Sequence, residues 1–155
     1  MSAFQNYPRI TPFLWFDSNA EEAVNFYLSI FKNSRRLNEH RAEGRVLTIG
    51  FELEGQKFTA LNGGPMFKFT EAVSFVVRCD SQAEVDEDWS KLAEGGSNLQ
   101  CGWLKDKFGL SWQVVPRRLP ELLTDPDPEK AQRVMQAMLQ MGKIEVAELE
   151  QAAAA

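Results

Sequence analysis

The chain has 155 residues, 44% of them hydrophobic, a length that fits one domain or two half-domains sharing a core. Its formal net charge of −5 disfavours a nucleic-acid partner, because the phosphates of nucleic acid require a basic face. No signal peptide and no apolar run of the ~20 residues that span a membrane are present, so we expect a cytoplasmic protein. Cys79 and Cys101 are too few for a disulfide framework and are expected to be reduced.

A short phrase occurs twice. Residues 17–21 read Asp-Ser-Asn-Ala-Glu, and residues 80–84 read Asp-Ser-Gln-Ala-Glu. Each phrase follows an apolar run and opens a stretch with helical spacing, so the repeat predicts two modules of the same architecture. The serine and glutamate of each phrase match a capping box, which predicts that Ser18 and Ser81 cap two helices.

The first half predicts a β-α-β-β order. Residues 10–16 are apolar and aromatic and indicate a strand, in which Pro12 favours an edge or irregular position. After the first predicted helix, residues 44–54 alternate as a strand, and residues 57–62 return as the second strand of a hairpin. One more short strand is expected near residues 34–39.

The second half repeats this order. Residues 73–79, 99–104 and 110–115 are predicted strands, and the second helix lies between the first two of them. The position of the additional short strand stays open in this half. The predicted buried face of the helix consists of Val85, Trp89 and Leu92.

A segment of different composition follows Pro116. Residues 120–128 are rich in proline and aspartate and predict a loop, and Asp127 and Pro128 match a helix start. The apolar stripe of this helix is Ala131, Val134, Met135, Met138 and Met141. Its helical spacing favours packing on the sheet or on a second subunit over a ligand groove.

Several stretches carry a resemblance to a known family: Phe-Leu-Trp-Phe-Asp at residues 13–17, Asn-Ala-Glu-Glu-Ala at 19–23, Gly-Gly-Pro at 63–65 and Asp-Lys-Phe-Gly-Leu-Ser-Trp-Gln-Val-Val-Pro at 106–116. With two βαβββ modules in one chain, they resemble the vicinal oxygen chelate superfamily of glyoxalases, bleomycin-resistance proteins and extradiol dioxygenases, and within it the PhnB-like subfamily. The resemblance covers nearly the whole chain after Tyr7.

The resemblance implies an α+β fold with a curled mixed sheet in each module and a cavity inside each sheet. A single glyoxalase-like domain would span residues 1–155. Module one is expected at about residues 8–66, module two at about 72–118, and a C-terminal helical arm at about 127–152. Relatives of this kind pair their modules in a dimer, so a homodimer is expected.

Metal-dependent members of the superfamily bind a divalent ion with His, Gln or Glu on the first strand of each module and Glu on the last. The corresponding positions here fall beside Pro12 and at Asn62, Ser74 and Gln113. Such a set would hold a divalent cation weakly, so we expect no metal and no cofactor. The single histidine, His40, is predicted to lie in a surface loop.

Strand alternation places Ser111 and Gln113 on one face of the last strand. Gln113 then either lines a cavity as a ligand-facing amide or is a structural amide bonded to a neighbouring backbone. Trp15 and Trp103 lie on or beside strands and are candidates to wall a cavity, although aromatic residues also dominate ordinary cores. The candidate ligand-binding residues are Gln113, Ser111, Ser74, Asn62, Trp15 and Trp103, and no catalytic residue is assigned.

The sequence therefore predicts a metal-free PhnB-like protein that binds a small organic molecule in the sheet cavity, with no nucleic-acid or membrane partner. One alternative is a glyoxalase-type lyase or isomerase, or another enzyme of the superfamily. A second alternative is a structural or regulatory dimer with a filled cavity. His40 alone supports neither a Ser/His/Asp set nor a cysteine nucleophile. A methyl transfer from S-adenosylmethionine usually needs a glycine-rich strand-to-helix loop, a context that Gly63-Gly64 and Gly95-Gly96 lack.

Overall fold

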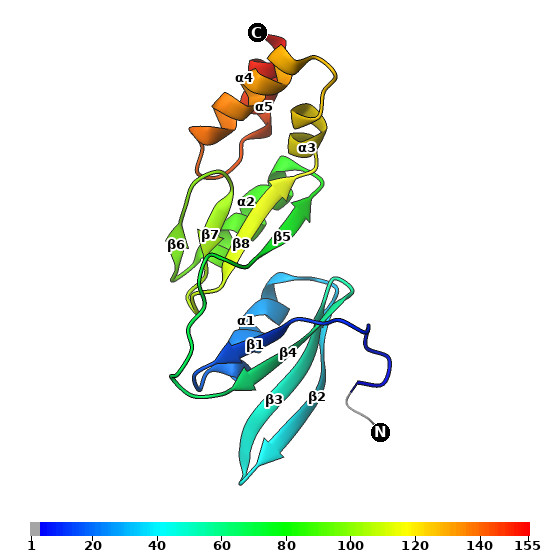
Figure 1. Ribbon diagram of the computed structural model, residues 1–155, viewed down its shortest axis with the longest axis vertical. Coiled ribbons are helices and arrows are strands. Elements are labelled where there is room, and N and C mark those ends of the chain that lie inside the picture. The colour runs from blue at the N-terminus through cyan, green and yellow to red at the C-terminus, as the bar shows by residue number, and fades with distance from the viewer. Residues whose placement is uncertain (1–3) are drawn as a thin grey trace. The chain divides into compact units, whose positions relative to one another are not determined.

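The computed structural model describes residues 4–155, which form two compact units divided between Phe69 and Thr70. Each unit contains a four-stranded mixed sheet and a helix, and the second unit also carries three C-terminal helices (Figure 1). The chain is therefore an α+β protein with two βαβββ-like modules and a helical arm, as the repeated phrase predicts.

Unit one contains β1 (Phe13–Phe16), α1 (Ala20–Ile30), β2 (Ser34–Ala42), β3 (Arg45–Leu53) and β4 (Gln56–Asn62). The strand order is β1-β4-β3-β2, with β1 parallel to β4 and the other pairs antiparallel. The short strand expected near residues 34–39 is β2. The predicted first strand loses residues 10–12, because Pro12 precedes the parallel ladder that begins at Phe13.

The core of unit one lies between α1 and one face of the sheet. Val24 and Tyr27 of α1 are fully buried, as are Ile49 and Phe51 of β3. The Phe51 ring stacks on Phe58 with 5.1 Å between centroids, which adds aromatic contact to the apolar burial. The face of the sheet that α1 does not cover is called the first open face.

The start of α1 does not use the predicted capping box. Asn19 is the N-cap residue and its side chain makes no capping hydrogen bond. Instead, the Ala20 N–H donates to Asn62 Oδ1 at 2.8 Å, and Asn62 Nδ2 donates to the Val46 carbonyl at 3.0 Å. The prediction for Ser18 is wrong because the parallel pairing of Phe16 with Asn62 brings a distant amide to the helix start.

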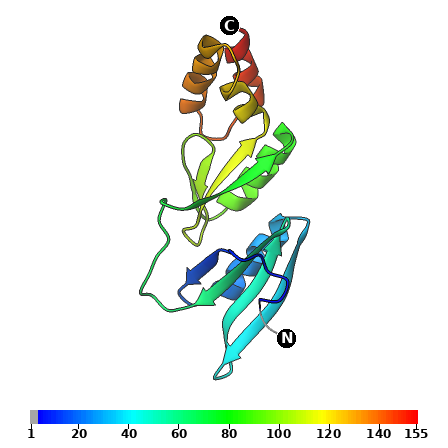
Figure 2. The same ribbon diagram turned by 45° about the vertical axis from the view of Figure 1, so that its right-hand side comes forward.

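Unit two contains β5 (Ser74–Cys79), α2 (Gln82–Ala93), β6 (Ser97–Asn98), β7 (Trp103–Lys105) and β8 (Ser111–Pro116). The strand order β5-β8-β7-β6, with β5 parallel to β8, repeats that of unit one (Figure 2). The second capping box is confirmed: Ser81 Oγ accepts from the Glu84 N–H at 3.2 Å. The Glu84 carboxylate accepts from the Asp80 N–H at 2.7 Å.

The predicted strand at residues 99–104 is instead a turn followed by β7. Cys101 and Gly102 both have positive φ, 59° and 83°, so the chain reverses between β6 and β7. Their N–H groups donate to the Met141 and Gly142 carbonyls, each at 2.8 Å. Two backbone N–H groups of this segment therefore bond the C-terminal arm, and the short strand left open by the sequence is β6.

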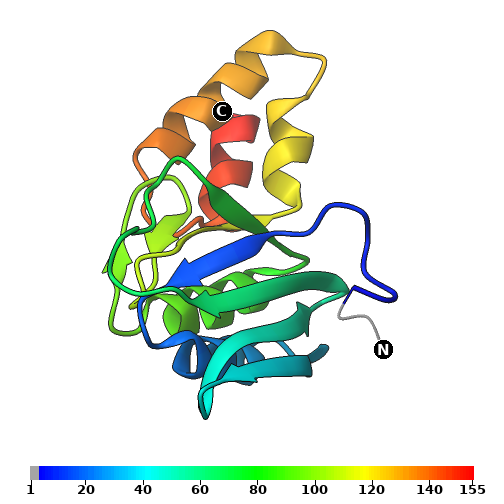
Figure 3. The same ribbon diagram turned by 60° about the horizontal axis from the view of Figure 1, so that its bottom comes forward.

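Neither four-stranded sheet is strongly curled, in contrast to the curled sheet that the resemblance implies (Figure 3). Closing a sheet into a barrel takes more than four strands. A sheet of four strands, two of them only two and three residues long in unit two, stays open.

The arm contains α3 (Arg118–Leu123), α4 (Pro128–Leu139) and α5 (Val146–Ala154). The predicted loop over residues 120–128 therefore begins with the end of a helix, whose first turn tolerates Pro120. At α4, Asp127 Oδ1 accepts from the Glu129 N–H at 3.0 Å and Pro128 occupies the first position, as predicted. The apolar residues of the arm bury one another: Leu119, Leu122, Val134, Met141, Ile144, Leu149 and Ala153.

Gln82 joins the arm to α2 of unit two. Its Nε2 donates to the Ile144 carbonyl at 3.0 Å, and its Oε1 accepts from the Val146 N–H at 2.7 Å. Lys143 forms an ion pair with Asp86 of α2 at 2.7 Å. The arm is thus held by hydrogen bonds to its own unit.

Candidate functional site

Four of the six predicted site residues share one face of the sheet in unit two. Ser74 lies opposite Ser111, and Gln113 lies between Val76 and Trp103. Directly paired residues of neighbouring strands point to the same side of a sheet. The alternate residues of β7 and β8 are buried with the inner face of α2: Leu104, Trp112, Val114, Val85, Trp89 and Leu92. The other side, which holds the four predicted residues, is called the second open face.

Gln113 is bonded to a side chain rather than to a backbone. Its Nε2 donates to Ser74 Oγ at 2.9 Å, and both residues are half-buried. Within residues 4–155 the amide oxygen of Gln113 accepts no hydrogen bond. Because the Gln113 Nε2–H group is bonded to Ser74, the orientation of the whole side-chain amide is fixed. The Gln113 amide oxygen is therefore held in one direction as a hydrogen-bond acceptor.

Ser111 supplies a second unused polar group on this face. Ser111 is fully buried. In the described part of the chain, its Oγ is the one buried side-chain nitrogen or oxygen atom without a hydrogen-bond partner. Leaving a buried hydroxyl without a hydrogen bond costs about 1–3 kcal/mol. This orphaned hydroxyl lies on the same face as the Ser74–Gln113 pair, in register with Ser74.

Apolar and charged groups complete the second open face. Val76 is 61% exposed and Trp103 is half-buried, so both present apolar surface. Lys105 pairs in register with Ser111 and forms an ion pair with Glu71. Small-molecule sites combine apolar surface with placed polar groups, and this face offers both.

Asp106, which the sequence analysis did not single out, fixes the turn before β8. It is buried, and its Oδ1 accepts from the N–H groups of Phe108 and Leu110 at 2.9 and 3.0 Å. Its Oδ2 accepts from the Trp112 indole N–H at 2.9 Å. These bonds set where β8 begins and hence on which face Gln113 points. The aspartate that opens a turn closed by Gly109 is the sequence signal for this role.

The two predicted site residues of unit one lie on opposite faces of its sheet. Trp15 is on the first open face, where its Nε1 donates to the Gly64 carbonyl at 2.9 Å and its ring lies 4.8 Å from that of Phe67. Asn62 lies on the face covered by α1, and both ends of its amide are used there. His40 lies in β2 opposite Thr48 and not in the predicted loop.

The donor groups do not fit a divalent metal site of the superfamily type. Of the corresponding positions, Asn62 is engaged in unit one, and Ser74 and Gln113 bond each other. Within residues 4–155, no group of three or more His, Cys, Asp or Glu side chains is placed to hold a metal ion. Neutral hydroxyl and amide oxygens alone are weak ligands for divalent cations.

Cys79 is not an activated nucleophile. Burial raises the pKa of its thiol to about 12, and the Asp88 carboxylate, 3.5 Å from Sγ, acts in the same direction. A thiol with so high a pKa holds almost no thiolate near neutral pH.

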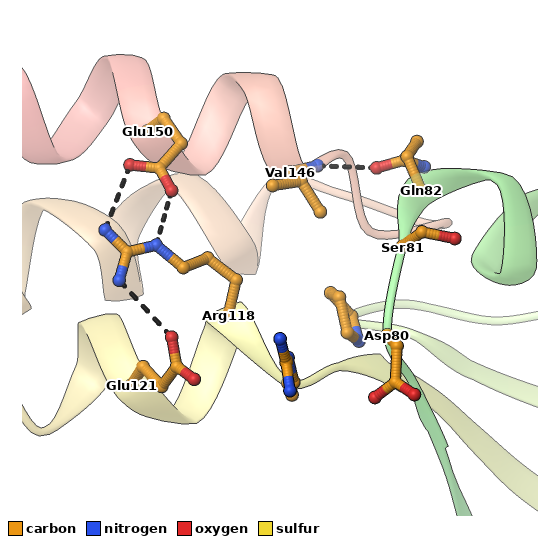
Figure 4. A pocket seen from close by; sticks show the side chains of 9 residues that line it. Asp80, Ser81, Gln82, Arg118, Glu121, Val146 and Glu150 are labelled. Carbon is orange, nitrogen blue, oxygen red and sulfur yellow. Dashed lines mark hydrogen bonds and ion pairs between the residues drawn. The ribbon is translucent and has the colours of Figure 1, made fainter.

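A pocket of about 310 Å³ lies where α2, α3 and α5 begin (Figure 4). Arg118 crosses it and bonds the carboxylates of Glu150 and Glu121, the latter at 3.3 Å. Gln82 closes another side through its bond to the Val146 N–H. The polar groups of this pocket are largely paired with one another, so it serves to attach the arm. The lining residues are Asp80, Ser81, Gln82, Pro116, Arg117, Arg118, Glu121, Val146 and Glu150.

Comparison with solved structures supports the fold. A PhnB protein from Bacillus cereus, proposed to be a 3-demethylubiquinone-9 3-methyltransferase, is 36% identical. The match covers 70% of this chain and 99% of that one, with a TM-score of 0.66. The protein PA1353 from Pseudomonas aeruginosa is 21% identical over 70% of this chain and 97% of that one, with a TM-score of 0.60. The fosfomycin resistance protein FosX from Mesorhizobium loti is 9% identical over 70% and 90%, with a TM-score of 0.54.

No curated protein matches the chain. Within residues 4–155, no helix is both long enough and apolar enough to cross a membrane. The model of the 3-demethylubiquinone-9 3-methyltransferase family matches residues 8–115, so the helical arm lies almost entirely beyond it. The chain therefore belongs to this PhnB-like family, and it shares its fold with PA1353 and with the fosfomycin resistance protein FosX.

Proposed function

We propose that the protein binds a small, largely apolar organic molecule on the second open face and needs no metal ion to do so. The observation that carries this proposal is the buried Ser111 hydroxyl without a partner, on the same face of the sheet as the amide oxygen of Gln113. Gln113 stands between the apolar side chains of Val76 and Trp103, where a hydrogen bond to a ligand is stronger than one in water.

The residues of the second open face would make two kinds of contact with a ligand, apolar contacts and hydrogen bonds. Trp103 and Val76 offer apolar contact, which favours burial of a ring or an aliphatic chain. Gln113 accepts a hydrogen bond from a ligand N–H or O–H group, and Ser111 donates to a ligand acceptor. Ser74 holds the Gln113 amide in the accepting orientation. A molecule with one donor and one acceptor next to an apolar body fits this set.

Methyl transfer, which the family description names, would need a site for a methyl donor. Gly63 and Gly64 follow β4 but lead into a loop, and a Cβ on Gly63 would lie 2.4 Å from the Trp15 ring. Gly95 and Gly96 follow α2 and lead into β6. Neither pair joins a strand to a following helix, so these glycines among the described residues do not form a glycine-rich nucleotide loop.

Native mass spectrometry of freshly purified protein tests the proposal by detecting a retained small molecule. The molecule found is then titrated by calorimetry into the wild type, Gln113→Ala, Ser111→Ala and the exposed control Gln100→Ala. Loss of a hydrogen bond worth about 1.4 kcal/mol corresponds to tenfold weaker binding, the result expected for Gln113→Ala but not for the control.

Equal affinities for Gln113→Ala and the control would refute this site, as would a protein that binds only after metal is added. Elemental analysis of the same sample is expected to find less than about one equivalent of zinc, nickel, iron or manganese, since the available donors are weak.

A further inference from the structure

The phenol side chain of Tyr7 lies on the first open face against Gly50, Asn38 and Lys57, a position called the seat. Asn38 Nδ2 donates to Tyr7 Oη at 3.2 Å. The Lys57 ammonium lies 5.3 Å from the centroid of the Tyr7 ring, a cation–π distance, and also bonds the Asn6 carbonyl. The hydroxyl is thus bonded by Asn38, and the ring face and the neighbouring backbone carbonyl are both contacted by Lys57.

Gly50 makes room for the hydroxyl. It lies in the middle of β3, paired with Asn38 on one side and Thr59 on the other. A Cβ built on Gly50 would lie 2.2 Å from Tyr7 Oη, far inside van der Waals contact. Glycine weakens a strand interior and often marks the close approach of another group, which here is the phenol.

The segment that carries Tyr7 is attached lightly. Phe4 and Ile10 are 64% and 89% exposed, and the Tyr7 N–H bonds Phe4 within the segment itself. The first backbone hydrogen bond from this part of the chain to the sheet joins the Pro12 carbonyl to the Thr59 N–H, at 3.1 Å. Residues 4–8 can therefore leave the face while Pro12 stays in place.

We propose that the seat formed by Gly50, Asn38 and Lys57 is a binding site for phenols, and that Tyr7 occupies it in cis as a built-in competitor. The first two residues provide a gap and a donor for a hydroxyl, and the third provides a cation for the ring. A free phenol competes with the Tyr7 side chain for the seat. The apparent affinity of the free phenol is therefore its intrinsic affinity multiplied by the fraction of molecules in which Tyr7 has left the seat. This inference goes beyond the proposed function, because it concerns the sheet of unit one.

The test uses 4-methylphenol, titrated into the 15N-labelled full-length protein and followed by amide chemical shifts. In Tyr7→Ala, shifts are expected at Gly50 and Asn38, with an affinity about fivefold or more above that of the wild type. The control Ile10→Ala alters an exposed residue of the same segment and should bind like the wild type. Toluene, which lacks the hydroxyl, should bind more weakly than 4-methylphenol to Tyr7→Ala.

Two further variants remove the seat in the Tyr7→Ala background. Gly50→Ala fills the gap, and Asn38→Ala, on exposed β2, removes the donor with less risk to folding; both are expected to abolish the shifts. The inference is refuted if 4-methylphenol leaves Gly50 unperturbed in Tyr7→Ala, or if Asn38→Ala binds it as well as Tyr7→Ala alone. Gln113 variants act on the other sheet, so failure of the proposed function would leave these results unchanged.

Discussion

Asp88 is a half-buried carboxylate on α2 that accepts a hydrogen bond from the Cys79 thiol at 3.5 Å. Burial raises the pKa of Asp88, and the charge of Glu87 adds to the shift, while the Cys79 bond opposes it. The native state therefore holds a proton over a pH interval in which the unfolded chain has released it. In that interval the free energy of unfolding falls as the pH rises.

Asp88→Asn should remove this loss. Relative to the wild type, the variant should gain stability as the pH rises from 3.8, the ordinary aspartate pKa, towards neutrality. Urea unfolding at a series of pH values measures the difference. Asp86→Asn is the control of opposite sign, because hydrogen bonds from Lys143 and Gln82 lower the pKa of Asp86. Parallel pH profiles for Asp88→Asn and the wild type would contradict the expectation.

Gln113 shows what residue patterns can and cannot predict. Alternation along β8 correctly places Ser111 and Gln113 on one face, because the strand is regular and its start is fixed by Asp106. The partner of Gln113 is Ser74, on a strand 39 positions away, and only the parallel register reveals that pairing. Asn62 was predicted from its strand position, but the same parallel geometry in unit one turns it to the helix start.

At the scale of single elements, α1 and α2 start in different ways, so serine substitutions at their starts should have different effects on stability. Ser81→Ala should lower the free energy of unfolding by about 0.5–2 kcal/mol, because Ser81 Oγ accepts the Glu84 N–H. Ser18→Ala should change it by less than about 0.5 kcal/mol, since no cap depends on that side chain. Asn62→Ala should cost about 1–3 kcal/mol by leaving the Ala20 N–H and the Val46 carbonyl unpaired.

Urea melts of the three variants measure these differences. Equal losses for Ser18→Ala and Ser81→Ala would show that the two helices start in the same way, against the structure.

Most elements were predictable because their signals are local. Helical spacing identified α1, α2 and α4, and alternation identified β3 and β4. The turn at Cys101 and Gly102 was missed because its backbone partners, Met141 and Gly142, lie about forty positions further on. Helix α3 was missed because its proline was taken as a loop signal, although Leu119 and Leu122 bury it against α4 and α5.

At the scale of the whole molecule, a homodimer remains our expectation. Each sheet taken by itself has outer strands, and Phe13 and Val76 on two of them are 55% and 61% exposed. Sedimentation equilibrium at micromolar concentration should give twice the chain mass of 17.6 kDa. A single species of chain mass at that concentration would refute it.

Removing the C-terminal arm should destabilise unit two. The apolar stripe of the arm is covered mainly by its own helices, and Gln82 and the turn at residues 101–102 bond it to unit two. Deleting residues 127–155 should therefore abolish cooperative unfolding of unit two, and not merely dissociate a dimer. Tryptophan fluorescence in a Trp15→Phe background reads this unit, since the other three tryptophans lie in it. A deletion variant that keeps a sharp fluorescence transition in that background would contradict the expectation.

The pairing of β1 with β4 has a consequence for synthesis on the ribosome. Unit one is complete once Phe69 has emerged, because β4 supplies both the parallel partner of β1 and the cap of α1. Unit two pairs β5 with β8, but the Cys101 and Gly102 N–H groups bond residues 141 and 142, about forty positions further along the chain. Since closing long loops slows folding and domains fold as units, the nascent chain should fold its first unit while the second still awaits its C-terminal helices.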